Sequence, residues 1–129
     1  MRSRGAGDGR ADRGAVTAEL ALGLVMLMSI TLGLVWMLAV GAAQVQVIDA
    51  SREAARALAR GEDEAIAIGI AERIAPPSAS ISISSSGSNS VSGPQVEVLT
   101  TALVKGPGGL WSHLPGLRVR STAVAVVEQ

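Results

Sequence analysis

The feature that most constrains this chain is a long segment without charge. After Glu19, the residues from Leu20 to Val40 are apolar except for Ser29, Thr31 and glycines, and the next charged residue is Asp49. A bilayer core of roughly 30 Å is crossed by about 20 helical residues of this kind. The segment therefore predicts a helix that spans a membrane once.

A short basic segment precedes the apolar one. Residues 1–14 contain four arginines and two aspartates, which gives a net side-chain charge of +2. The positive-inside tendency keeps such a segment in the cytoplasm and directs the rest of the chain outward. We therefore expect a basic leader peptide over 1–14, a transmembrane helix over 15–43, and extracytoplasmic residues beyond it.

The remaining residues are enough for one small domain. The chain has 129 residues and no cysteine, so a domain outside the cytoplasm would have to hold together without disulfides. Outside the leader, acidic side chains outnumber basic ones by two, which offers no basic surface for nucleic acid. A domain of this size is marginal alone, and we expect neighbouring molecules to stabilise it.

The helical pattern continues beyond the apolar segment. Residues 44–61 are rich in helix formers, lack proline, and end at Gly61, a typical C-terminal stop. Their charges recur at helical spacing and so fall on one face; they are Asp49, Arg52, Glu53, Arg56 and Arg60. The pattern predicts one continuous helix of about 46 residues, with 44–61 as its amphipathic continuation.

Residues 62–129 are expected to form a small extracytoplasmic α+β domain. Three acids over 62–64 favour a helix start, and 65–75 predicts a short second helix that ends at two prolines. The apolar period then changes to two, which predicts three strands near 79–83, 96–104 and 117–127, joined by loops over 85–93 and 105–116. The near-continuous apolar stretch 123–127 indicates a strand covered on both faces. The expected fold is a long N-terminal helix laid against a small antiparallel sheet.

The N-terminal junction resembles that of TadE-like minor pilins of tight-adherence and type IV pilus systems. The resemblance rests on Gly14 before a cleavage position, Ala15 as the new N-terminus, Glu19 at the fifth mature position, and the apolar helix behind them. The segment 49–61 resembles the helix extension of these chains, and 117–127 resembles their last strand more loosely. Ala15 departs from the aromatic residue that is common at this position in the long major pilins.

This resemblance implies cleavage between Gly14 and Ala15 by a membrane prepilin peptidase. Glycine has no side chain and so permits close approach by a protease. Cleavage frees a positive α-amino group, and the resemblance implies that Glu19 pairs with this group in its own or a neighbouring subunit. Such a pair in low dielectric sets helix register better than it adds net stability.

Other interpretations of the same residues stay open. Glu19 at the helix end could extend to the lipid headgroups without a partner. Leader and apolar segment could instead form a secretory signal cut after Ala43, giving a secreted binding domain that begins at Gln44. An uncut chain would be a small binding domain anchored to the membrane.

No pattern in the chain indicates catalysis, a metal or a cofactor. His113 is the only histidine, and we expect it in an exposed loop or a packed turn. The acids 62–64 could bind a cation but fit a helix start better, and Trp111 is expected to anchor its loop on the sheet. Gly23 and Gly33 admit close helix approach, and are equally typical of tolerated glycines in a membrane segment.

Together these observations predict a non-enzymatic, pilin-like minor subunit or assembly factor of a tight-adherence or type IV pilus system. Its expected partners are a prepilin peptidase, other pilin or pseudopilin subunits, the pilus assembly platform and the membrane. It would be a single-pass membrane protein with its C-terminal domain outside the cytoplasm, and it could enter a surface pilus.

Overall fold

A computed structural model describes residues 8–86, 95–107, 113 and 115–126. Two helices are followed by three strands in the order α1, α2, β1, β2 and β3. The chain divides into two compact units, Met1–Val35 and Trp36–Gln129. The first unit contains the early part of α1, and the second contains its later part with all the other elements.

Helix α1 runs over Asp8–Ala59, so it begins earlier than the expected start at residue 15. Residues 8–13 contain alanine and two arginines, contain no proline, and have acids near the start where the helix dipole favours them. The helix stops at Ala59, two residues before Gly61, whose φ is +81°. The N–H of Gly61 donates to Leu58 O and that of Glu62 to Ala57 O, at 3.0 and 3.1 Å. These two bonds form a Schellman motif and confirm the glycine as the stop.

Helix α2 covers Glu64–Ile74, within one residue of the expected 65–75. Asp63 caps its N-terminus, because a carboxylate oxygen of its side chain accepts a hydrogen bond from Glu64 N at 2.9 Å. Ala75 is extended, as a residue before proline tends to be, and ends the helix. Local signals at both ends therefore set the length of α2.

The three strands are β1 (Ala79–Ser86), β2 (Gln95–Val104) and β3 (Leu117–Val126). They form one antiparallel sheet in the order β1-β2-β3, with Ile83 opposite Val98 and Val98 opposite Ala123. This confirms the α+β layout of a long helix, a short helix and a three-stranded sheet. Most of the expected loop over 85–93 lies outside the described residues.

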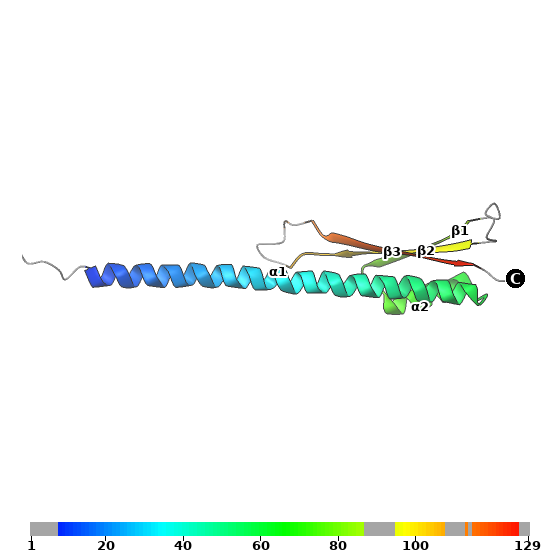
Figure 1. Cartoon of the computed structure of the whole chain (residues 1–129), viewed down its shortest axis with the longest axis horizontal. Helices are drawn as coiled ribbons and strands as arrows, with labels where there is room; N and C mark the ends of the chain where they lie inside the picture. Colours follow the sequence, from blue (N-terminus) through cyan, green and yellow to red (C-terminus); the bar gives the residue numbers. More distant parts are fainter. Residues whose placement is uncertain (1–7, 87–94, 108–112, 114, 127–129) are drawn as a thin grey trace, which may run out of the picture. The chain divides into compact units, whose positions relative to one another are not determined.

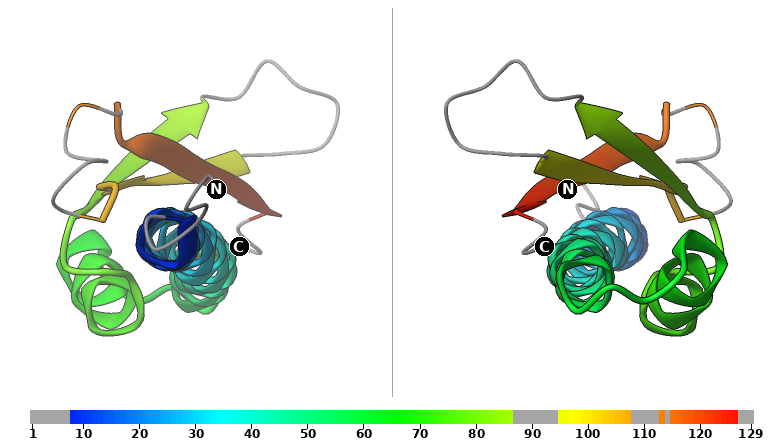
Figure 2. Two further views of the ribbon diagram at one scale, coloured as in Figure 1. Left: turned by 90° about the vertical axis from the view of Figure 1, so that its left-hand side faces the viewer. Right: turned by 90° about the vertical axis from the view of Figure 1, so that its right-hand side faces the viewer.

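Both helices of the second unit lie on the same face of the sheet (Figures 1 and 2). Along β2 the side chains that face them are the buried ones, namely Val98, Thr100 and Ala102. The other face has no covering layer among the described residues, and the expectation that 123–127 is covered on both faces is wrong. Val124 and Val126 are 58% and 46% exposed, because alternate residues of β3 point to this open face.

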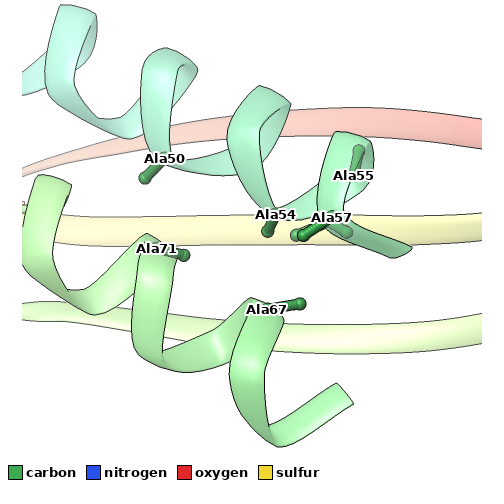
Figure 3. Packing of buried hydrophobic residues seen from close by; sticks show 7 residues of the cluster. Ala50, Ala54, Ala55, Ala57, Ala67 and Ala71 are labelled. Carbon is green, nitrogen blue, oxygen red and sulfur yellow. The ribbon is translucent and has the colours of Figure 1, made fainter. Parts of the chain in front are cut away.

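Alanine dominates the core between the two helices and the sheet. Ala54 and Ala57 of α1 lie toward Ala67 and Ala71 of α2, and all four are fully buried (Figure 3). Partly buried larger side chains such as Ile81 pack against this cluster. Small side chains let the two helix backbones approach closely, so the arrangement leaves little room for substitution.

Candidate functional site

The proposed processing and assembly residues lie in the first unit, on α1. Gly14, Ala15 and Glu19 are all exposed. Ala15 and Glu19 are four residues apart, so they lie one turn apart on the same face of the helix. A positive charge at residue 15 would therefore lie within reach of the Glu19 carboxylate.

Glu19 lies in a stripe of residues along one side of α1, and this stripe has a notch at Gly23, which lacks a side chain. The stripe contains Val16, Leu20, Gly23 and Leu24 beside the acid. Apart from its chain neighbours and the backbone of its own helix, a Cβ added at Gly23 would meet no described atom within 4 Å, so one turn beyond the acid the helix surface is open. A neighbouring helix could approach closely at this notch and so bring its own groups beside Glu19.

The carboxylate of Glu19 makes no ion pair or hydrogen bond with any other residue whose side chain the structure describes. The arginine side chains of residues 8–13 are not among these. A charge within a membrane-length apolar segment costs a few kcal/mol on insertion scales, about 2.5–3.5 kcal/mol at the helix centre, and less near the ends. A positive partner would therefore lower the free-energy cost of placing the Glu19 carboxylate in lipid.

The peptide bond between Gly14 and Ala15 lies inside α1, seven residues after the helix begins. A protease requires its substrate extended across the active site, so cleavage at this bond requires local unwinding of the first turns. Gly14 lowers the cost of that unwinding by roughly 0.5–1 kcal/mol relative to alanine. Glycine at this position would thus favour a cut at this bond through its backbone as well as through its missing side chain.

The apolar side chains of α1 that follow Glu19 are exposed rather than buried. The segment Gly14–Ala59 is the only described helix long and apolar enough to cross a membrane, and no residue of its most apolar window is buried. Leu24, Met28 and Leu34 are each more than 60% exposed. A buried core helix is thereby excluded, whereas a signal sequence would share these properties.

The charged face predicted for the helix continuation is present in the second unit. Asp49, Arg52, Arg56 and Arg60 are exposed, and Glu53 is half-buried. Two ion pairs involve this face: Arg56 with Glu53 at 3.5 Å and Arg60 with Glu62 at 2.9 Å. Both are surface pairs and contribute little stability.

An open groove of about 240 Å³ lies between this charged face and the edge strand β3. Arg52 and Arg56 line it from α1, and residues 123–125 line it from the strand. The free edge of β3 and the two guanidinium groups thus lie side by side on the surface of the second unit.

One contact was missed by the sequence analysis. The indole Nε1 of Trp36 donates a hydrogen bond to the carbonyl oxygen of Lys105, 3.0 Å away and 69 residues later in the sequence. This bond holds the end of β2 to the first residue of the second unit. One feature of the sequence could have drawn attention to Trp36. It follows Ala15 by about the number of helical residues that cross a bilayer, and tryptophan is enriched at membrane interfaces.

The remaining candidates have ordinary structural roles or fall outside the description. His113 is exposed. Of the three acids at the start of α2, Asp63 caps the helix and Glu62 pairs with Arg60, and the described residues hold no group of three or more potential metal ligands. A Cβ at Gly33 meets nothing within 4 Å, and Trp111 lies outside the described residues.

Comparison with protein-family models, with curated proteins and with solved structures found no match for this chain.

Proposed function

We propose that this protein is a TadE-like minor subunit or assembly factor of a tight-adherence or type IV pilus system. In this proposal a prepilin peptidase cuts after Gly14, the apolar helix stays in the membrane, and the second unit lies outside the cytoplasm. The observation that carries the proposal is the spacing of Ala15 and Glu19, one turn apart where the exposed apolar part of α1 begins. Cleavage would create an amine one turn before the acid, on the same face of the helix.

The later part of α1 also favours retention of the helix over removal. A secretory cut after Ala43 would remove Ala43 itself, which is buried at 7% exposure in a cluster with Val47 and Val119, and Val40, which packs against that cluster. It would also remove Trp36 and its bond to the end of β2. The sheet would lose part of the helix that covers it. A signal peptide is removed from the mature protein, so its residues do not normally form part of the folded core.

Assembly with other pilin or pseudopilin subunits is supported by two exposed features. The stripe around Glu19 offers an acid beside a glycine notch in the membrane segment. The charged face with Arg52 and Arg56 offers lateral ionic contacts outside it. Neighbouring helices would then be held in register by the amine and acid, and above the membrane by the charged face.

The intact mass and N-terminal sequence of the protein recovered from membranes test this proposal. We expect a mature chain that begins at Ala15 when a prepilin peptidase is present, and an uncut chain when it is absent. Gly14→Leu should block the cut, while Gly9→Leu, which changes a leader glycine away from the bond, should leave it intact. A chain that begins at Gln44, or one that keeps Met1 with the peptidase present, would overturn the proposal.

A further inference from the structure

The end of the second unit where β2 finishes and β3 begins is the part nearest to Trp36. The two strands meet there with Val104 opposite Leu117 and Leu103 opposite Arg118. The bond from Trp36 to Lys105 joins this end to α1 at the first residue of the unit. We call this end, made of Trp36, Leu103, Lys105, Leu117 and Arg118, the Trp36 end.

The height of Trp36 relative to a bilayer follows from the length of helix before it. From Ala15 to Trp36 the helix rises about 32 Å at 1.5 Å per residue. This is close to the roughly 30 Å of a bilayer hydrocarbon core. With Ala15 near one surface, Trp36 lies at the other, and its bond to Lys105 brings the end of β2 to the same level whatever the orientation of the rest of the unit.

The composition of the Trp36 end suits a lipid surface. Leu103 and Leu117 are 40% and 47% exposed, although each could have been polar at such a position. Lys105 and Arg118 are exposed beside them and have no acidic partner among the described residues. An aromatic residue, exposed leucines and unpaired cations are the groups that contact headgroups and the upper acyl chains at an interface.

The rest of the open sheet face differs from this end. Ser80, Ser82 and Thr122 occupy the outward positions farther along the strands and are exposed. Thr122 is four residues from Arg118 on β3, about 13 Å along the strand. Ser80, Ser82 and Thr122 thus separate Leu103 at the Trp36 end from Val124 and Val126, which are 58% and 46% exposed at the far end of β3.

We propose that the Trp36 end rests on the outer leaflet of the membrane, with Leu103 and Leu117 in the interfacial region and Lys105 and Arg118 on anionic phospholipid headgroups. The proposal rests only on the membrane insertion contained in the proposed function, and not on cleavage or on a pilus. The contact fixes one end of the sheet toward lipid and leaves the charged face of α1 free for neighbouring subunits.

The absence of cysteine in the chain allows a direct test with single labels. The full-length protein carrying Leu103→Cys, labelled with the environment-sensitive dye NBD, is reconstituted in vesicles of phosphatidylethanolamine and phosphatidylglycerol. We expect blue-shifted emission that is quenched by nitroxide-labelled lipid. The same dye at Thr122→Cys should emit as in water and be quenched little. Equal quenching at the two positions would overturn the proposal, as would extraction of the protein by alkaline carbonate.

The contact of Lys105 and Arg118 with anionic headgroups is tested separately. Charge reversal by Lys105→Glu with Arg118→Glu should reduce quenching at position 103 in vesicles with phosphatidylglycerol and have little effect in pure phosphatidylcholine. Retention of full quenching in the anionic vesicles would remove the basic residues from the proposal. The N-terminal mass of the same samples reports cleavage independently, so a failure of the pilin-like proposal is told apart from a failure of the lipid contact.

Discussion

The hydroxyl groups of Ser51 on α1 and Ser121 on β3 lie 2.9 Å apart, and Ser51 is fully buried. Ser51 donates its proton to Ile48 O at 2.9 Å, so the bond between the two serines has Ser121 as its donor. Helix and edge strand are thus joined by a satisfied polar contact. A second hydrogen bond joins the same two elements: Gln44 Nε2 on α1 donates to the carbonyl oxygen of Arg120, the residue before Ser121 on β3, at 3.2 Å.

We expect a measurable coupling energy between Ser51 and Ser121. A double-mutant cycle of Ser51→Ala and Ser121→Ala in full-length protein in detergent micelles, followed by urea unfolding of the second unit, should give about 0.5–1.5 kcal/mol. The exposed pair Ser80 and Thr101, whose hydroxyls are 2.7 Å apart, serves as the control and should show a coupling near zero. Equal coupling in both pairs would show that burial does not strengthen the bond.

Thr100 is the opposite case, a buried hydroxyl without a partner in the described part of the chain. Thr100→Val removes the unsatisfied hydroxyl from the core and keeps the branched shape, so we expect the free energy of unfolding to rise by about 1 kcal/mol. Thr122→Val on the open face of β3 is the matched control and should change stability by less. Loss of stability in Thr100→Val would indicate that the hydroxyl has a partner in solution.

The alanine core predicts strong sensitivity to side-chain size on one face of α2. Ala67 is fully buried, and Ala65, two residues earlier, is exposed. Ala67→Leu should lower the free energy of unfolding by about 1–3 kcal/mol or more, because added methylenes in a packed core force backbone shifts. Ala65→Leu adds the same atoms to the surface and should have little effect. Urea titrations of the two variants, compared at the same protein concentration, distinguish the outcomes.

Two glycines in similar surroundings should respond in opposite directions to alanine. A Cβ at Gly61 or at Gly69 would meet no other described atom within 4 Å, but Gly61 has φ of +81° and Gly69 is helical. Gly61→Ala should therefore destabilise by about 1–2 kcal/mol, and Gly69→Ala should stabilise by up to about 1 kcal/mol. Thermal unfolding of both variants measures the difference. Stabilisation by both would mean that the helix stop is not set by backbone conformation at Gly61.

The order and type of the elements could be predicted because the apolar period changes from helical to alternating at Pro76 and Pro77. The ends of α2 could also be predicted from the local sequence, because Asp63 and the two prolines act on their nearest neighbours. The open face of β3 could not be predicted from its own residues. Val124 and Val126 look like core, and their exposure depends on both helices packing on the other face. The position of Trp36 indicates an interfacial tryptophan, but nothing in the local sequence indicates that Lys105, 69 residues later, is its partner.

Glu19 gives the sharpest prediction for assembly. We expect Glu19→Gln to leave the cut after Gly14 unchanged but to weaken parallel packing of neighbouring helices, because the amide cannot neutralise the new amine of Ala15. Packing can be measured by oxidative cross-linking of processed protein in membranes, with single cysteines placed by Leu20→Cys on the stripe that contains Glu19 or Val25→Cys on the opposite side. Both positions are more than half exposed.

Cross-linking through position 20 should exceed that through position 25 when Glu19 is present. It should fall to the level of position 25 in Glu19→Gln, whereas Glu64→Gln, an exposed acid at the start of α2, should leave the difference intact. In uncut protein, obtained with Gly14→Leu, the advantage of position 20 should be lost as well, because the amine does not form. Equal cross-linking from both faces of cut protein with Glu19 intact would mean that the acid does not set helix register and meets the headgroups instead.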